Sequence, residues 1–286
     1  NDCRLAGYVE GISLLSRSAL QERKQQIRWA ALTASISVFM AALLLYPLMS
    51  GLLSRTVALS SRLLESNLSL LRSLGNAIAK RDADTDAHNY RVTCYAVTLA
   101  EAVGVDKETI AELVLGAFLH DVGKIGIPDQ ILLKPGRLTS EEFQVMQTHA
   151  VLGIEIVAGN PWLAGAEQTI RHHHERYDGK GYPDGLSGEA IPFAARIFAL
   201  VDVFDALTSV RPYKPALSLD ETLSIMEREV GQHFDPAIYV VFRQIAPVLY
   251  EQGQSRDHAQ WILELKAMLE RCFKMKTAPE GAAAFT

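Results

Sequence analysis

The sequence predicts an all-α protein in which a helical bundle is preceded by a transmembrane helix and a linker helix. After residue 80, apolar residues recur with helical spacing along most of the chain, and no convincing stretch alternates apolar and polar residues as a half-buried strand does. Residues 29–54 carry no charged side chain, which sets them apart from the rest of the chain.

The composition is that of a folded protein without duplex nucleic acid as a partner. Of the 286 residues, 49% are hydrophobic and 21% charged, and the formal net charge is -5. A duplex phosphate backbone requires a basic surface, whereas a small anionic ligand needs only a few local cations. Three widely separated cysteines, Cys3, Cys94 and Cys272, show neither metal-binding spacing nor a disulfide framework, which suits a reducing compartment.

Residues 29–54 are predicted to form the transmembrane helix. Twenty-six uncharged residues exceed the roughly 20 that a helix needs to cross a bilayer. Trp29 and Tyr46 near the two ends suit the membrane interfaces, and basic residues flank the segment on both sides. The alternative is a buried core helix, but such helices are rarely free of charge over this length. Because the two flanks are similarly basic, charge does not decide the orientation.

The segments on either side of the span are expected to be helical. Residues 1–28 are predicted to be a juxtamembrane helix, and we expect further residues upstream because the chain begins at Asn1 rather than Met. Residues 55–79 are predicted to be a linker helix that pairs with a second copy in a homodimer, although Gly75 falls in its seam. Apolar residues recur there at mostly heptad spacing: Val57, Leu64, Leu68, Leu71 and Ile78. The alternative is one amphipathic helix packed on the following domain.

Residues 80–250 are predicted to form the catalytic domain, and residues 251–286 a C-terminal helix and tail. Periodicity predicts helices over Asn89–Val103, Lys107–Asp121, Thr139–Ala158, Glu167–Glu175, Ala194–Thr208, Leu219–Gly231, Ile238–Glu251 and Trp261–Phe273. Thr139 and Glu142 form a capping-box pattern at the start of the third.

Histidines and aspartates in this domain indicate a metal site. The set comprises His88, His120, Asp121, His149, His173, His174 and Asp202. His120 and Asp121 end an apolar run, and Asp202 lies inside another, where an unpaired ionised group is costly. Metal ions compensate several such groups at once, and nitrogen and oxygen ligands suit iron, manganese or zinc. His172, His233 and His258 are left outside the site.

Two pairs of neighbouring residues indicate two metal ions. Adjacent residues on one helix point in different directions, so His173 and His174 are expected to serve different metal ions a few ångströms apart. His120 is expected to bind one metal ion while Asp121 bridges both. Ligands on separate helices are the usual way in which helical bundles build such sites.

Longer motifs around these residues resemble those of a known family. Residues 120–129 resemble the signature of the HD superfamily of metal-dependent phosphohydrolases, and residues 173–183 resemble the HHE and GYP motifs of its HD-GYP branch. Further matching segments are residues 133–139 before His149, residues 202–208, residues 211–214 and residues 233–236. The resemblance covers roughly residues 75–245 and implies an HD-type helical bundle.

The resemblance also implies the ligands of the metal ions. The seven residues named above match the family's ligands for two divalent metal ions, iron or manganese, with Asp121 bridging. The three-metal form of the family has a glutamate four residues before His88. Asp84 stands there as the candidate ligand of a third metal ion, and Asp86 and Ala87 replace the family's usual glycines, so the third metal ion depends on this segment.

The activity that the resemblance implies is hydrolysis of cyclic di-GMP to pGpG, GMP or both by a metal-dependent phosphodiesterase. Two metal ions lower the pKa of a bridging water, and the resulting hydroxide attacks the phosphorus in line. Asp121 and Lys124 are the catalytic candidates, with Lys124 as a cation near the scissile phosphate. Tyr182 is expected to line the substrate cleft, and Arg211 and Lys214 to hold substrate phosphates.

These parts together predict a signalling enzyme of the bacterial inner membrane whose catalytic domain is cytoplasmic, where the nucleotide is made. The alternative is a catalytically weak or inactive receptor of the same family that binds the nucleotide or a protein partner. The full ligand set opposes this alternative, and the altered segment at residues 84–87 keeps it open.

Overall fold

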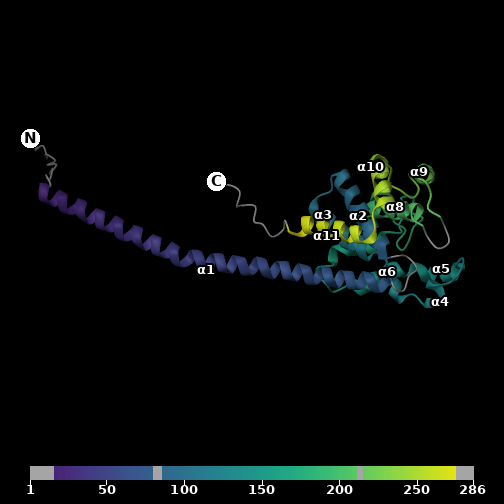
Figure 1. Cartoon of the computed structure of the whole chain (residues 1–286), viewed down its shortest axis with the longest axis horizontal. Helices are drawn as coiled ribbons and strands as arrows, with labels where there is room; N and C mark the ends of the chain where they lie inside the picture. Colours follow the sequence, from purple (N-terminus) through teal and green to yellow (C-terminus); the bar gives the residue numbers. More distant parts are fainter. Residues whose placement is uncertain (1–15, 80–85, 211–214, 275–286) are drawn as a thin grey trace, which may run out of the picture. The chain divides into compact units, whose positions relative to one another are not determined.

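The computed structural model describes residues 16–79, 86–210 and 215–274. Apart from two isolated β-bridges, all regular elements in these residues are helices (Figure 1), so the predicted all-α fold is confirmed. The α-helices are α1 (Arg17–Ala79), α2 (Asp86–Val103), α3 (Lys107–Leu119), α4 (Asp129–Leu132), α5 (Ser140–Gln147), α6 (His149–Val157), α7 (Glu167–His172), α8 (Phe193–Thr208), α9 (Leu219–Arg228), α10 (Pro236–Ser255) and α11 (His258–Lys274). The 3-10 helices are η1 (Val122–Gly126), η2 (Ala164–Ala166) and η3 (Gly188–Ala190).

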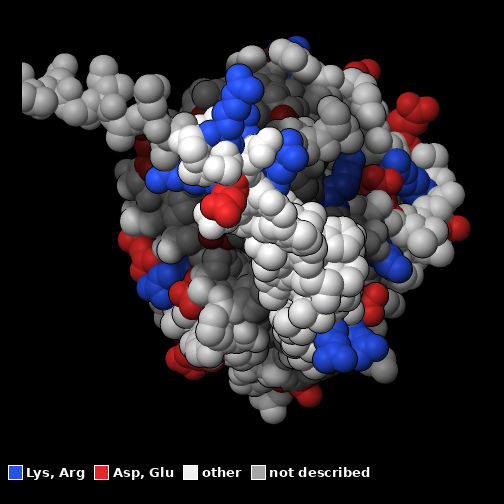
Figure 2. All heavy atoms as spheres, turned by 90° about the vertical axis from the view of Figure 1, so that its left-hand side faces the viewer, with Lys and Arg blue, Asp and Glu red and all other residues white. Residues whose placement is uncertain are grey.

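Within the described part of the chain, α1 is the one helix that is long and apolar enough to cross a membrane, judged by length and composition. It contains the whole predicted span at residues 29–54 and continues through the predicted linker at residues 55–79. Large apolar side chains are exposed along the span. Figure 2 shows this stretch of α1 as a column of white atoms without charged groups, with blue Lys and Arg side chains at both ends.

The last turns of α1 pack on the helical domain. Leu71 and Ile78 are buried in its core, and Leu68 packs against it. Gly75 lies so close to α3 that a Cβ at this position would be 2.6 Å from Cε1 of Phe118. This part of the heptad pattern therefore agrees with the alternative interpretation, in which the helix packs on its own domain. Gly75 lies at the contact with Phe118.

The core of the domain is built around α2, which packs against α3, α8, α10 and α11. Tyr95 of α2 contacts Phe204 of α8 and Trp261 of α11 in edge-to-face ring pairs. All three side chains are buried. Burial of each such side chain contributes on the order of 1.5–3 kcal/mol, so this cluster anchors the middle of α2 against α8 and α11.

Several helices begin at residues that satisfy their first backbone N–H groups. Asp106 accepts the N–H groups of residues 108 and 109 at the start of α3, and Asp235 does the same for α10, where Pro236 follows. The predicted capping box of Thr139 and Glu142 is present at the start of α5. Such caps typically contribute about 1 kcal/mol each and fix where the helices start.

Helix ends differ from the prediction at the residues that matter most for the site. The helix expected over Thr139–Ala158 is broken at Thr148, whose N–H and hydroxyl both bond to the Val145 carbonyl and tighten the last turn of α5. A new helix, α6, then starts at His149. Likewise α3 ends at Leu119 and α7 at His172. The candidate ligands at residues 120, 121, 149, 173 and 174 consequently lie at helix ends.

Candidate metal centre

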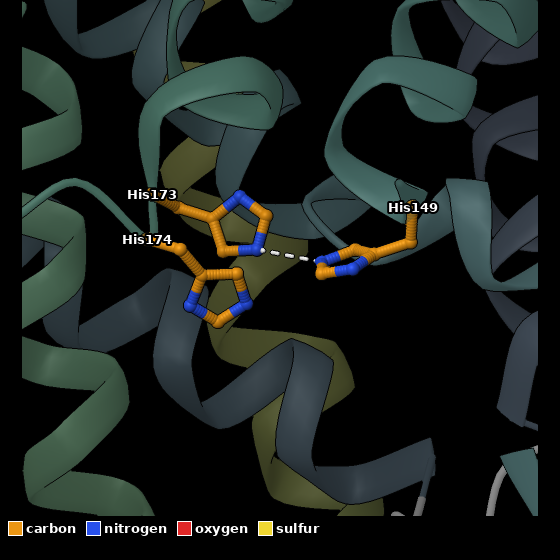
Figure 3. A group of neighbouring side chains, drawn as sticks. All are labelled: His149, His173 and His174. Carbon is orange, nitrogen blue, oxygen red and sulfur yellow. Dashed lines mark hydrogen bonds between the residues drawn. The ribbon is translucent and has the colours of Figure 1, made fainter. Parts of the chain in front are cut away.

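Two groups of candidate metal ligands lie inside the helical domain. The first comprises His149, His173 and His174, and the second comprises His88, His120 and Asp202. Within each group the candidate ligand atoms lie within 4.8 Å of one another. His174 and Asp202 are half-buried and the other members are buried. Figure 3 shows the three rings of the first group turned toward one another.

The rings of His149 and His173 face each other through their Nε2 atoms, 3.3 Å apart (Figure 3). Each Nδ1 lies against a backbone carbonyl, 2.7 Å from Met146 for His149 and 2.8 Å from Ile170 for His173. A carbonyl oxygen only accepts hydrogen bonds, so each Nδ1 carries the proton and each Nε2 of a neutral ring presents a lone pair. Two lone pairs at this distance need a cation between them, and a metal ion fits this donor set.

The second group is built in the same way. The Nδ1 of His120 donates to the Ala117 carbonyl at 2.8 Å, and the Nδ1 of His88 donates to the Asp205 carboxylate at 2.6 Å. The Nε2 of His88 then lies 3.5 Å from Oδ1 of Asp202. Hydrogen bonds of this kind fix the tautomer and orientation of metal-binding histidines and raise their basicity.

Asp121 lies between the two groups. Its Oδ2 is 3.0 Å from Nε2 of His120 and its Oδ1 is 3.5 Å from Nε2 of His149. The ammonium of Lys124, one turn of η1 further on, is 2.8 Å from Oδ2. Burial alone would raise the pKa of Asp121, but His120 and Lys124 hold it well below its usual range. One carboxylate thus offers an oxygen to each histidine group.

The protonation of the histidines follows from these surroundings. Burial, and after it neighbouring histidines, lower the pKa of His149, His173 and His174, and together they bring the pKa of His174 to about 3. Neutral imidazole is the form that binds metal ions. Burial also disfavours the charged form of His120, but Asp121 overrides it and raises the pKa to about 9. The position between Nε2 of His120 and Oδ2 of Asp121 therefore favours a cation, either a proton or a metal ion.

The sequence reasoning gave no role to Asp205, which the structure places directly behind His88. This buried carboxylate accepts the His88 Nδ1–H and also pairs with the Nε–H and one Nη2–H of Arg91, the latter at 2.8 Å. Arg91 further donates to Oγ of Ser209 at 2.7 Å. The signal for Asp205 was its spacing: it lies three residues after Asp202 and therefore on the same face of α8.

The loop after the paired histidines is closed by the buried carboxylate of Glu175. Its two oxygens accept the backbone N–H groups of Asp184, Gly185 and Leu186 at 2.8, 3.1 and 3.0 Å. Three bonds to one carboxylate hold the far end of the loop against its start. Glu175 therefore shapes the loop rather than contributing to either ligand group.

Inside this loop, Gly181 brings Tyr182 to the histidines. A Cβ at Gly181 would lie 2.6 Å from the His174 carbonyl oxygen, so a side chain does not fit at this position. The Tyr182 ring lies against the His174 ring, with centroids 4.7 Å apart. Burial raises the pKa of Tyr182, so its hydroxyl stays protonated and can donate a hydrogen bond.

The remaining site predictions have different outcomes. Asp84, Arg211 and Lys214 lie outside the described residues. His172, His233 and His258, which the sequence reasoning left outside the site, belong to neither ligand group. His172 contacts Asp184 instead, at 3.1 Å. His173 and His174, which the sequence reasoning expected to serve different metal ions, lie in one candidate group with ring centroids 4.1 Å apart.

The fold and the site together define a class, the all-helical domains that hold metal ions between histidine and carboxylate ligands from different helices. A model of the HD domain family matches residues 72–238, which is more than half of the chain. The chain belongs to the HD domain family. The resemblance that the motifs around residues 120 and 173 carry is thereby confirmed.

Curated relatives of the chain are named as cyclic dinucleotide phosphodiesterases. It is 44% identical over 191 residues to the cyclic di-GMP phosphodiesterase response regulator RpfG of Xanthomonas campestris, covering 64% of this chain and 50% of that protein. It is 44% identical over 185 residues to a cyclic di-GMP phosphodiesterase of Vibrio cholerae (59% and 38%). It is also 38% identical over 191 residues to the 3′3′-cGAMP-specific phosphodiesterase 2 of V. cholerae (66% and 36%). The chain spans half or less of the length of these relatives.

Proposed function

We propose that this chain is a metal-dependent phosphodiesterase that hydrolyses cyclic di-GMP to pGpG, GMP or both. The observation that carries the proposal is the position of Asp121, which turns one oxygen to His120 and the other to His149 and so links the two histidine groups. A carboxylate in this position suits a bridging ligand of two metal ions. The names of the relatives support cyclic di-GMP as the substrate.

The residues of the chain have separate roles in this proposal. His149, His173 and His174 would hold one divalent metal ion and His88, His120 and Asp202 another, while Asp121 offers an oxygen to each group. Bound metal ions would supply an activated water and positive charge for the phosphate oxygens. Lys124, within reach of Oδ2 of Asp121, places an ammonium beside the same phosphate and stabilises the leaving oxygen. Arg211 and Lys214 hold the remaining phosphate charge.

Iron and manganese are the metal ions that we propose. Together with Asp121, each group combines imidazole nitrogens with carboxylate oxygens, a mixture that suits first-row divalent metals rather than calcium or magnesium. A third metal ion depends on Asp84. Metal analysis of anaerobically purified protein identifies the metals and their number per chain.

The proposed enzyme is anchored in the bacterial inner membrane by α1, with the catalytic domain in the cytoplasm. The uncharged stretch of α1 leaves its large apolar side chains exposed, as a helix surrounded by lipid does. We further propose that the chain dimerises through its linker helix. Leu59, Leu63 and Leu70 are exposed there at coiled-coil spacing, on a different face from the packed Leu71 and Ile78.

The test is turnover by the full chain in detergent, loaded with iron or manganese. We expect cleavage of cyclic di-GMP to exceed cleavage of 3′3′-cGAMP, which the 38% identical relative is named for. Asp121→Ala should abolish both metal binding and turnover, whereas the exposed Asp220→Ala, a matched control, should change neither. If the chain binds cyclic di-GMP but does not cleave it with any of the metals tested, the alternative function of a receptor would be supported. Turnover retained by Asp121→Ala would refute the assignment of the site.

A further inference from the structure

A large aromatic side chain lies exposed beside the histidine groups without belonging to them. Phe143 of α5 is 46% exposed. Its ring meets that of Tyr182 edge to face, with centroids 6.1 Å apart and an interplanar angle of 84°. Neither the sequence motifs nor the proposed chemistry gives Phe143 a role.

A short series of rings connects Phe143 to the ligand groups. The Tyr182 ring is tilted by 32° from that of His174, at 4.7 Å, and its centroid is 6.4 Å from that of His149. Phe143 is the next ring outward from Tyr182. Both ends of the series are held firmly. Glu175 ties down the loop that carries Tyr182, and the capping box of Thr139 and Glu142 fixes the start of α5.

Exposure of one aromatic ring is unremarkable by itself, because large apolar side chains are common on protein surfaces. The position of Phe143 sets it apart. Edge-to-face geometry turns the flat face of one ring to the rim of the other, so the pair forms a corner with apolar walls. This corner lies beside the candidate metal centre, next to His174.

A cyclic dinucleotide needs a cationic environment and an apolar aromatic surface next to each other. Its two phosphodiester groups carry the negative charges, and its two purines present flat apolar faces beside them. Stacking of a base on an aromatic side chain contributes roughly 1–3 kcal/mol and is tolerant of base identity. The ammonium of Lys124 and metal ions held by the imidazole and carboxylate groups would satisfy the phosphate, whereas an aromatic face stacks with the base.

We propose that Phe143 and Tyr182 form a stacking platform for one purine of the cyclic dinucleotide. This inference rests on the proposed function and extends it, because it assigns the base to α5 and the GYP loop while the phosphate stays at the histidines. Phe143 is then a substrate-binding residue, and it supplies affinity for a purine without reading which purine it is.

Val145 of the same helix offers a matched control. It is also apolar and partly exposed, at 38%, but it is aliphatic and takes no part in the series of rings. Residues two apart on a helix point in different directions, so Val145 lies away from the Phe143 ring. Truncation of Val145 therefore controls for the general loss of an exposed apolar side chain from α5, and only the aromatic position should affect stacking of a base.

The experiment uses the full, metal-loaded chain and a cyclic dinucleotide in which one guanine is replaced by 2-aminopurine, whose fluorescence is quenched by stacking. Wild type is expected to quench the probe on mixing. Phe143→Leu should lose most of the quenching and raise KM for cyclic di-GMP about 5- to 100-fold. Phe143→Trp should retain both properties, and Val145→Ala should match wild type.

The outcomes separate this inference from the proposed function. Equal quenching and equal KM in wild type and Phe143→Leu would overturn the platform even if the chain is an efficient phosphodiesterase. Quenching that depends on Phe143 without turnover would support the platform and overturn the enzymatic proposal. Thermal unfolding of each variant checks folding, and Phe143→Trp keeps the test informative if Phe143→Leu is unstable.

Discussion

Replacing Asp205 by asparagine tests how the second histidine group is held. The side chain is buried on α8 and accepts hydrogen bonds from Arg91 and from Nδ1 of His88. Although burial alone raises the pKa of Asp205, Arg91 and His88 hold it below its usual range, so the group is a carboxylate in the folded protein. Asparagine has nearly the same shape but no charge. It leaves the Arg91 guanidinium, whose side chain is 14% exposed, without this anionic partner.

The expected effect on stability is large. Removing one partner of a buried ion pair typically costs about 3–5 kcal/mol, because the other charge stays buried. For a domain of this size about 1 kcal/mol corresponds to roughly 2–4 °C, so the midpoint of thermal unfolding should fall by about 6–20 °C. The loss of the bond to His88 should also weaken metal binding by about 10- to 100-fold, the usual effect of removing the partner of a ligating histidine.

Two measurements on the full chain in detergent check this prediction, urea unfolding of the metal-free protein and metal affinity by competition with a chelator. Glu227→Gln is the matched control, since Glu227 pairs with Arg243 at 3.0 Å on the surface, where both side chains are more than half exposed. That change should cost less than about 1 kcal/mol and leave metal affinity as it is. Unchanged stability and unchanged affinity in Asp205→Asn would mean that Asp205 neither neutralises Arg91 nor orients His88.

Three further predictions concern other parts of the domain. Gly75→Leu drives a side chain against the buried Phe118 ring and should lower the free energy of unfolding by about 1–3 kcal/mol; the exposed Ser73→Ala should change it little, and equal effects in urea unfolding would contradict the packing. Glu175→Gln removes a carboxylate oxygen from the bonded loop and should cost about 1–3 kcal/mol while raising KM more than it lowers kcat; a lower kcat with unchanged KM would argue against a loop-shaping role. Burial lowers the pKa of His233 from 6.5 to about 4, so protons bind the unfolded chain more readily and stability should fall as pH drops from 6.5 toward 4. His233→Gln should make this fall smaller. The measurement is the free energy of unfolding in urea at pH 7 and pH 5, and an equal loss between the two pH values in wild type and His233→Gln would refute the assignment.

Sequence reasoning worked best where a physical cost restricts the residue type. A carboxylate such as Asp121 directly after an apolar helix needs a partner, and the structure places it between two histidine groups. The capping box of Thr139 and Glu142 was equally predictable, because it depends on local chemistry alone. Periodicity likewise gave the all-α class.

Residues that act through another side chain were out of reach of that reasoning. Asp205 and Arg91 are 114 positions apart, and the sequence around neither residue indicates that the two form a pair. Phe143 fits an amphipathic pattern as a core residue, and only its exposure in the folded domain distinguishes it. The heptad pattern of the linker helix was ambiguous for a related reason. A stripe of leucines packs equally well on a second helix or on its own domain, and Phe118 decides the matter at Gly75.

The arrangement of His173 and His174 explains how the site is built. Side chains of adjacent residues diverge by about 100° on a regular helix, which led to the expectation that the two rings face different metal ions. The helix ends at His172, however, and the chain turns there, so that both rings converge on His149. The same holds for His120 and Asp121, which follow the last residue of α3. Helix ends thus bring together the ligands at residues 120, 121, 149, 173 and 174, whereas His88 and Asp202 reach the site from within α2 and α8. Asp121 can face both groups since it lies just outside a helix.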